Sequence, residues 1–162
     1  MPVFVRPMQA DEARRFLDIH HASVRGLAAK DYPASVIDAW ARVPVTDEQV
    51  QRFVQNRDNE IRLIAEGCDG ESLGVGALVV DNSELRACYV LPTAARRGVG
   101  TAIVAEIERL AREHGLGELH LESSVTAEPF YAALGYRVEG RGEHRIAPGV
   151  GMGAIRMRKQ LG

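Results

Sequence analysis

Two arginines and two glycines follow an apolar segment near the middle of this chain, and their spacing suits the binding of an anion. Residues 85–90 are rich in strand formers, a proline follows at residue 92, and a helical pattern begins directly after the glycines. At such a strand-to-helix junction, backbone N–H groups lie at the positive end of the helix, where a phosphate can be held. Gly98 and Gly100 let this backbone turn tightly and approach an anion without a Cβ atom in the way. Arg96 and Arg97 add fork-shaped donors, so we predict a phosphate-binding loop, with a plain turn and solvated arginines as the alternative.

The helix expected after this loop supports the prediction. Residues 98–114 carry apolar side chains at helical spacing, and Gly115 is a fitting stop. The loop lacks the Gly-Lys-Ser/Thr sequence with which an NTPase reaches a terminal phosphate and magnesium. It also lacks the third glycine of the dinucleotide fingerprint, because residue 102 is an alanine. The pattern therefore favours a pyrophosphate held mainly by the backbone.

The same segment resembles the acetyl-CoA-binding segment of the GNAT N-acetyltransferases. In that family a strand, a Gln/Arg-x-x-Gly-x-Gly/Ala loop and a helix hold the pyrophosphate of CoA. Here the loop runs from Ala95 to Gly100, so Ala95 replaces the usual Gln or Arg while both glycines remain. Residues 130–138 resemble the second family signature, a short helix with a tyrosine four residues before a Gly-aromatic pair. The two motifs follow each other in the family's order, and the resemblance spans essentially the whole chain.

The resemblance implies a binding site for acetyl-CoA. In the family two neighbouring parallel strands move apart, and the pantetheine arm pairs with the freed backbone of one of them, which also supplies an oxyanion donor. Carried over to this chain, the residues expected to contact acetyl-CoA are Cys88, Tyr89, Val90, Arg96, Arg97, Gly98, Val99, Gly100, Thr101, Ser124 and Phe130. Ser123 is the alternative to Ser124, because the segment 122–131 is shorter than in many relatives.

Acyl transfer to an amine also needs two proton transfers, and the resemblance assigns one of them to Tyr131. Its phenol matches the family's catalytic tyrosine, which donates a proton to the departing CoA thiolate. The alternative is an aromatic side chain that packs a short helix on the sheet. Glu122 and Glu84 are the two candidates for the base that removes the amine proton, because both are carboxylates at strand ends. His20 lies on the apolar face of the first helix and is more typical of a hydrogen-bonded core histidine than of a base.

The function that the resemblance implies is an acetyl-CoA-dependent N-acetyltransferase acting on a primary amine of a small molecule or a peptide. Residues 20–40 resemble a bacterial group of uncharacterised GNAT proteins, in which an Asp-Tyr pair precedes a helix that ends in Ala-Trp. Either Tyr32 and Trp40 line the acceptor pocket and Asp31 binds a cationic amine, or the three serve as capping and packing residues. A non-catalytic acyl-CoA-binding or regulatory domain is the alternative, favoured by Ala95, and a nucleotide-phosphate-binding module is a third possibility.

Length and composition fit one cytoplasmic domain over residues 1–162. The net charge of −2 gives no global field that would recruit nucleic acid or an acidic membrane, and no apolar run reaches membrane-spanning length. The N-terminus has no signal-peptide pattern. Neither the two cysteines, Cys68 and Cys88, nor the five histidines have the spacing of a metal site or a disulfide framework. We therefore expect no metal, an amine acceptor as the partner, and a monomer or homodimer.

The elements that must position these residues follow from periodicity and capping signals. Strands are predicted at residues 3–6, 61–66, 73–80, 85–90, 119–122, 136–140 and 154–158. Helices are predicted from a cap at Asp11 to about residue 25, over 33–40, from a capping box at 46–49 to about residue 57, and over 98–114 and 128–134. The glycine-rich segment 142–153 is predicted to be a mobile loop. This order predicts an α/β (α+β) fold of the GNAT type, with a mixed, mostly antiparallel sheet of six or seven strands flanked by helices.

Overall fold

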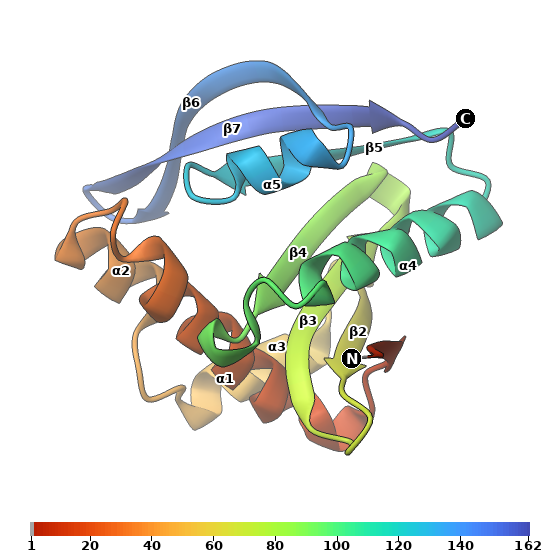
Figure 1. The fold of residues 1–162 in the computed structure, drawn as a ribbon. Helices are drawn as coiled ribbons and strands as arrows, with labels where there is room; N and C mark the ends of the chain where they lie inside the picture. Colours follow the sequence, from red (N-terminus) through yellow and green to blue (C-terminus); the bar gives the residue numbers. More distant parts are fainter. Residues whose placement is uncertain (1) are drawn as a thin grey trace.

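A seven-stranded sheet with the order β1-β2-β3-β4-β5-β7-β6 forms the centre of the structure, a computed structural model that describes residues 2–162 (Figure 1). Its strands are β1 (Phe4–Pro7), β2 (Ile61–Glu66), β3 (Ser72–Val79), β4 (Glu84–Val90), β5 (Glu118–Ser124), β6 (Arg137–Ala147) and β7 (Val150–Gln160). Neighbouring strands pair antiparallel except for β4 and β5, which are parallel. The expected mixed, mostly antiparallel sheet is confirmed.

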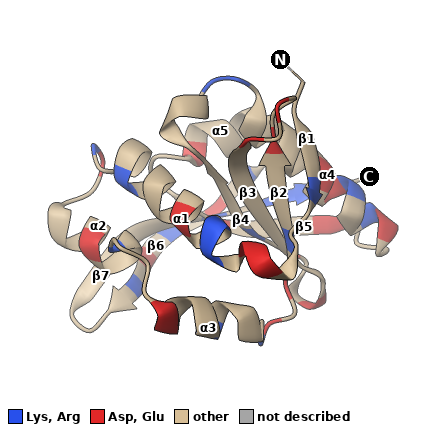
Figure 2. Cartoon of the chain, turned by 90° about the horizontal axis from the view of Figure 1, so that it is seen from below, with Lys and Arg blue, Asp and Glu red and all other residues tan. Residues whose placement is uncertain are grey.

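Helices cover both faces of this sheet. They are α1 (Ala13–Ser23), α2 (Ala34–Ala41), α3 (Asp47–Gln55), α4 (Val99–Glu113) and α5 (Glu128–Ala133). α1 packs on one face of β3 and β4 with α3 beside it, and α4 packs on the opposite face (Figures 1 and 2). Basic and acidic residues are intermixed along these elements rather than grouped by sign (Figure 2). None of the helices in residues 2–162 combines the length and the apolar character that crossing a membrane requires.

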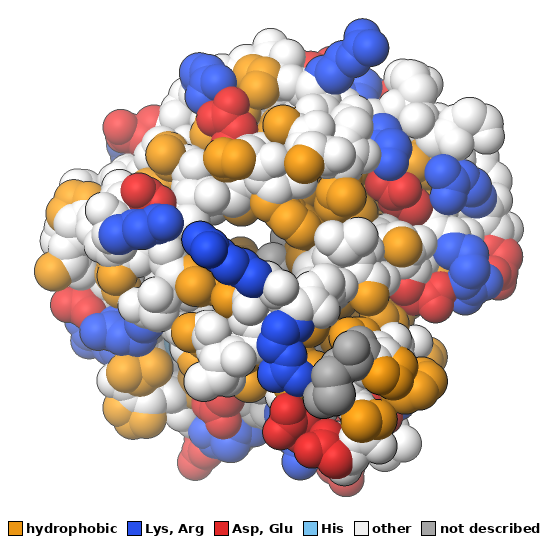
Figure 3. All heavy atoms as spheres, in the orientation of Figure 1, with side chains coloured by type: hydrophobic (Ala, Val, Ile, Leu, Met, Phe, Trp, Pro, Cys, Tyr) orange, Lys and Arg blue, Asp and Glu red, His pale blue; other side chains and the backbone are white. Residues whose placement is uncertain are grey.

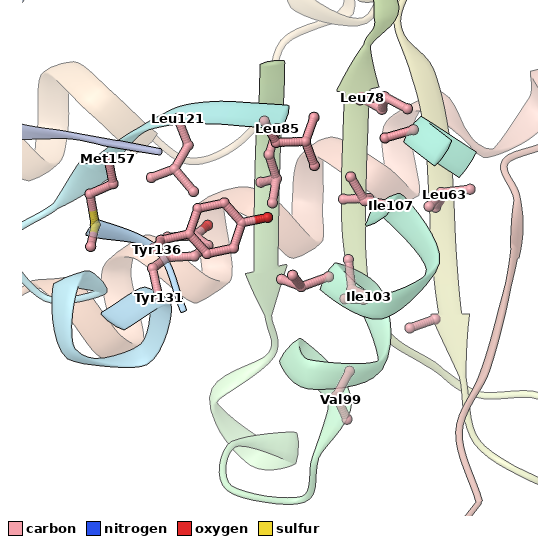
Figure 4. Close-up of a cluster of buried hydrophobic side chains, with 14 of the residues drawn as sticks. Leu63, Leu78, Leu85, Val99, Ile103, Ile107, Leu121, Tyr131, Tyr136 and Met157 are labelled. Atoms are coloured by element: carbon pink, nitrogen blue, oxygen red, sulfur yellow. The ribbon is translucent and has the colours of Figure 1, made fainter. Parts of the chain in front are cut away.

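The main core lies between α4 and the sheet. Val99, Ile103 and Ile107 of α4 point at β2 and β3, and Tyr131 and Tyr136 close the cluster beside β5 and β7 (Figure 4). This close packing depends on glycine in β3, because a Cβ atom at Gly76 would lie 2.5 Å from Cγ2 of Ile103. The helical periodicity predicted from the sequence is thereby confirmed, and it fixes α4 directly beside the strand that precedes its loop.

The segment 142–153 is a β-hairpin, so the prediction of a mobile loop is wrong. β6 and β7 stay paired through it, from Gly142↔Ala154 to Ala147↔Val150 with a register shift between Arg145 and Ala147, and the turn between them places Gly149 at a φ of 73°. The glycines inside the strands make room for neighbouring side chains, since a Cβ atom at Gly151 would lie 2.1 Å from Oε1 of Glu143. Glycine is depleted in strands in general, which hid the hairpin from sequence reasoning.

The N-terminal helices differ from the prediction at their ends. A 3₁₀ turn, Ala10–Glu12, precedes α1, and a π-helix, Val24–Ala28, follows it. Asp11 is not the cap, because it lies inside the 3₁₀ turn, whose N-cap is Gln9, while the N-cap of α1 is Glu12. α3 begins at the predicted capping box but ends at Gln55 rather than near residue 57, because Asn56 adopts a left-handed φ of 47°. The helices themselves lie where the sequence places them.

Candidate active site

β4 and β5 meet at one end and then diverge. Their parallel pairing is confined to Glu84↔His120, and Figure 1 shows the two strands moving apart from that point. On its other edge β4 stays paired with β3, and the N–H of Leu91 donates to the carbonyl of Leu73 at 2.9 Å. Because successive residues of a strand direct their N–H and C=O groups to opposite edges, Cys88 and Val90 present theirs toward β5. The divergence therefore leaves the main chain of β4 free to bind a ligand.

A cleft of about 1330 Å³ occupies the space between these strands. Figure 3 shows the surface hollowed there, with hydrophobic side chains on its walls and basic side chains at its edge. All but one of the residues assigned to acetyl-CoA binding or catalysis from the sequence line it, namely Glu84, Cys88, Tyr89, Val90, Arg96, Gly98, Val99, Gly100, Thr101, Glu122, Ser124, Phe130 and Tyr131. The exception is Arg97, which is exposed and lies outside the lining.

The loop before α4 presents unpartnered backbone donors to this cleft. Gly98 is the N-cap of α4 at a φ of 79°, a left-handed conformation that glycine adopts without strain. The first N–H to bond back is that of Ala102, to the carbonyl of Gly98 at 3.0 Å, so the N–H groups of Val99, Gly100 and Thr101 have no partner within the helix. The first turn of α4 holds no acidic residue, and the helix dipole adds positive potential there. These features fit the pyrophosphate of CoA.

Gly100 has a second role that the sequence did not reveal. A Cβ atom there would lie 3.0 Å from Cζ of Phe130 and 3.6 Å from Cγ2 of Val90. Glycine at this position therefore lets α4 approach the Phe130 ring, which joins the cofactor loop to α5 across the cleft.

Tyr131 lies in α5 at the inner wall of the cleft. It is 6% exposed and packs edge-on against Phe130 and Tyr136, with ring centroids 5.1 and 5.8 Å away. Burial raises the pKa of its phenol well above 10, so the group stays protonated and can act as a proton donor. Burial also raises the pKa of the Cys88 thiol to about 12, which leaves that thiol neutral. Of the polar side chains here, Tyr131 suits the role of an acid.

The two candidate bases differ in how fully their carboxylates are occupied. Glu84 accepts two hydrogen bonds from Arg86, at 2.9 and 3.0 Å. Burial would raise the pKa of Glu84, but the hydrogen bonds and charge of Arg86 outweigh it and the pKa is lowered. Glu122 lies on β5 with its side chain 53% exposed, and its carboxylate lies 3.5 Å from Nδ1 of His144. Glu122 is therefore the more available acceptor of a proton.

The two serines of β5 are both engaged locally. The hydroxyl of Ser124 accepts the N–H of Ala127 at 3.1 Å, which shapes the turn into α5. Ser123 is buried and donates to the carbonyl of Ser124 at 2.7 Å. Both residues line the cleft, and these contacts leave the choice between them open.

His20 departs from the sequence prediction of a hydrogen-bonded core histidine. Its ring stacks on Tyr89 with centroids 4.0 Å apart, and its Nε2 is buried without a hydrogen-bond partner in residues 2–162. Burial, and to a lesser extent the neighbouring His21, lowers the pKa of His20 to about 3. His20 does not line the cleft, so it supports Tyr89 rather than touching a ligand there.

Tyr32 and Asp31 do not line the cleft but form hydrogen bonds that connect the N-terminal helices to β7 and to the segment after β5. The Tyr32 hydroxyl donates to the carbonyl of Gly153 and accepts the N–H of Val125, each at 2.8 Å. Asp31 accepts a hydrogen bond from Thr126 at 2.6 Å. Trp40, the third residue singled out in this segment, does line the cleft and packs edge-on against Tyr32.

Sequence reasoning missed the charged residues that β5, β6 and β7 bring to the cleft, which are His120, Glu139, His144, Arg156 and Arg158. Most of them belong to the hairpin that was predicted as a short pair of strands with a loop between them. Alternation of polar and apolar residues in 154–158 was the available signal, since Ile155 and Met157 are buried between exposed or partly exposed arginines.

Comparison with known proteins identifies the class to which this fold and cleft belong. Residues 28–161 match the family described as the acetyltransferase (GNAT) domain. The chain belongs to the GNAT family and is an N-acetyltransferase, as the two sequence motifs had indicated.

Individual relatives agree with this assignment. A spermidine N(1)-acetyltransferase of Thermoplasma acidophilum is 20% identical over 147 residues, covering 86% of this chain and 91% of its own length. A GCN5-related N-acetyltransferase from Rhodopseudomonas palustris superposes with a TM-score of 0.89 at 27% identity, covering 99% of this chain and 96% of its own. The PaiA N-acetyltransferase of Thermoplasma acidophilum, solved with coenzyme A, has a TM-score of 0.75 at 20% identity and covers 99% of each chain. The GNAT acyltransferase fold predicted from the sequence is confirmed.

Proposed function

We propose that this chain transfers the acetyl group of acetyl-CoA to a primary amine of a small molecule or a peptide. The observation that carries the proposal is the opened β4–β5 pairing beside a helix start whose N–H groups have no partner. A family member solved with coenzyme A supports the same cofactor. We extend the proposal to residues 1–162 as one catalytic domain acting in the cytoplasm, where the two free cysteines stay reduced.

The free main chain of β4 has two tasks in this proposal. Acetyl-CoA supplies its acetyl group as a thioester, which is activated toward attack by an amine. The backbone groups of Cys88 and Val90 hold the extended arm of the cofactor along the strand, and one of their N–H groups stabilises the negative charge that develops on the carbonyl oxygen. The loop from Gly98 to Thr101 anchors the pyrophosphate at the other end.

Two side chains handle the protons. Glu122, directly or through a water molecule, takes a proton from the acceptor ammonium so that a free amine is present to attack. As the new C–N bond forms and the C–S bond breaks, Tyr131 donates its phenolic proton to the departing sulfur, and the second proton that the amine nitrogen loses returns through water to restore the phenol. The raised pKa of Tyr131 keeps the proton in place until charge develops on that sulfur.

Release of free CoA thiol in the presence of an amine tests the proposal. The assay is best run on the Cys68→Ser variant, because Cys68 is exposed and would react with a thiol reagent, whereas Cys88 is partly buried and its raised pKa keeps the thiol neutral. We expect acetyl-CoA to raise the melting temperature, and thiol release to require both an amine and an intact Tyr131. Stabilisation without thiol release across a broad amine panel would favour a non-catalytic acyl-CoA-binding domain. Equal stabilisation by ATP would favour a nucleotide-phosphate-binding module.

A further inference from the structure

We infer that the preferred acceptor carries an anionic group, such as a carboxylate, beside its amine, and that Arg156 binds this group. The inference rests on the proposed acetyl transfer and deepens it, because it names the class of acceptor. It stands on three observations: the pairing of charges in the cleft, the room made for the Arg156 guanidinium, and the position of Glu122.

Most charged side chains that line the cleft already have partners. Glu84 is bound by Arg86, and Glu139 pairs with Nε of Arg158 at 2.9 Å. Arg158 also pairs with Glu118. Arg156 lines the same cleft, yet within residues 2–162 it makes neither an ion pair nor a side-chain hydrogen bond. Arg156 is therefore a positive charge without a partner on the wall of the cleft formed by β5, β6 and β7.

The strand beside Arg156 is shaped to give its guanidinium room. Arg156 pairs in register with Gly140 of β6, at a point where a β-bulge interrupts the β6–β7 ladder. A Cβ atom at Gly140 would lie 2.7 Å from Nη2 and 3.4 Å from Nε of Arg156. The guanidinium thus lies across a residue that has no side chain, and any larger residue at 140 would displace it.

Glu122 supplies the complementary charge next to Arg156. The two residues are directly opposite each other in the β5–β7 register, so their side chains lie on the same face of the sheet. They form no ion pair with each other, because the Glu122 carboxylate lies 3.5 Å from His144 instead. The Glu122 carboxylate and the Arg156 guanidinium are thus neighbours that do not pair with each other. Together they fit an acceptor whose ammonium group and anionic group lie a few atoms apart.

A polyamine fits this cleft less well. A polycation needs several carboxylates without partners, whereas Glu84 and Glu139 are bound by arginines and Glu122 alone is free of them. The relative in Thermoplasma acidophilum is named for spermidine, so this chain is expected to differ from it in acceptor charge. Arginine binds carboxylates through paired N–H donors, which gives the site both charge and orientation.

Matched acceptor pairs test the inference. Thiol release from acetyl-CoA is measured with L-leucine, L-methionine, L-phenylalanine, L-glutamine and 4-aminobutyrate, and with the carboxamide of each, alongside spermidine. We expect kcat/KM for at least one acid to exceed that for its amide by about 10-fold or more, the effect of a charge-assisted hydrogen bond.

Variants of the wall show whether Arg156 causes this preference. Arg156→Gln should abolish the preference for the acid over its amide, mainly by raising the KM for the acid, and Arg156→Lys should restore part of it. Gly140→Val should lower the acid-to-amide ratio of kcat/KM while keeping the arginine, and Arg145→Gln, an exposed arginine on β6 outside the cleft, should leave the ratio unchanged.

The possible failures are distinguishable. Thiol release with amides or spermidine but no preference for any acid overturns the inference and leaves the acetyltransferase proposal intact. An acid preference that survives in Arg156→Gln also overturns it. Stabilisation by acetyl-CoA with no thiol release from any acid, amide or polyamine contradicts both the proposed function and the inference built on it.

Discussion

The wall of the cleft formed by β4 and the start of α4 offers mainly backbone groups, whereas the wall formed by β5, β6 and β7 offers charged side chains. On the first wall, Gly98 and Gly100 serve by having no side chain, and the donors are the N–H groups beside them. On the second wall, Glu122 and Arg156 serve through their charges. A wall of backbone groups depends on the conformation of one short segment, so it suits acetyl-CoA, the cosubstrate that stays the same whatever the acceptor is. A side-chain wall can change with single substitutions, so it is the place where acceptor preference is set.

The largest effect is expected from breaking the backbone wall. Gly98→Val places a β-branched residue at a φ of 79° and distorts the loop that holds the pyrophosphate. We expect the Kd for acetyl-CoA to rise at least ~100-fold, because two or more hydrogen bonds to a charged group are lost. Isothermal titration measures this, with circular dichroism to show that the variant folds.

Arg97→Ala is the matched control for that variant. Arg97 is exposed and outside the cleft lining, so its loss removes at most a screened charge and should change the Kd less than about threefold. Comparable losses from the two variants would mean that the loop binds through its side-chain charges and that the contrast between the walls is wrong.

The next effect is expected where the two walls meet. Tyr131→Phe keeps the ring that packs on Phe130 and Tyr136 and removes only the hydroxyl. We expect kcat to fall about 100-fold, a typical contribution of general acid catalysis, while the Kd for acetyl-CoA stays unchanged. Steady-state kinetics with the true acceptor, paired with titration of acetyl-CoA, separate the two quantities. Unchanged turnover would make Tyr131 a packing residue and leave the proton to water.

A smaller effect is expected from loosening the link between the N-terminal helices and the side-chain wall. Tyr32→Phe removes the hydrogen bonds to Gly153 and Val125 and should lower the free energy of unfolding by about 1–2 kcal/mol. The KM for the acceptor should rise while the Kd for acetyl-CoA stays the same. Thr126→Val, which removes only the exposed contact to Asp31, is the control and should cost less. A rise in the Kd for acetyl-CoA with no change in the acceptor KM would contradict the claim that one wall binds the cofactor and the other binds the acceptor.

The smallest effect concerns pH. The pKa of His20 is about 3 in the folded protein and about 6.5 when unfolded, so the unfolded chain binds more protons between these values. The free energy of unfolding should therefore be fully present above pH 6.5 and fall by about 1 kcal/mol on going from pH 7 to pH 5.5. In His20→Phe this loss should disappear, as urea denaturation at the two pH values measures. Glu12, whose pKa is lowered to about 2, acts only below pH 4.5 and leaves this window clear. Parallel losses in both proteins would show that His20 is not the group that titrates.

The backbone wall was accessible to sequence reasoning because it is continuous in the chain. Strand, loop and helix follow one another from residue 84 to 113, and each leaves a local signal in glycine placement or apolar periodicity. The side-chain wall could not be predicted from the sequence, because Arg156 becomes a binding candidate only once the fold places β7 between β5 and β6. Glycine at 140 and 151 resembles a loop in sequence, whereas in the structure it makes room for Arg156 and Glu143. The hydrogen bond from Val125 to Tyr32 joins residues 93 positions apart, and no local pattern reports it.

Amide hydrogen exchange with and without acetyl-CoA tests the central claim most directly, because it reads the backbone wall itself. We expect slower exchange at Cys88, Val90 and residues 98–101 in the presence of the cofactor, because these N–H groups face the opened strand pair or precede the first helical hydrogen bond. Exchange in the β6–β7 hairpin, residues 140–153, should remain as it was until an acceptor is added. Protection confined to the hairpin, with residues 98–101 exchanging as before, would contradict the claim that main chain holds the cofactor.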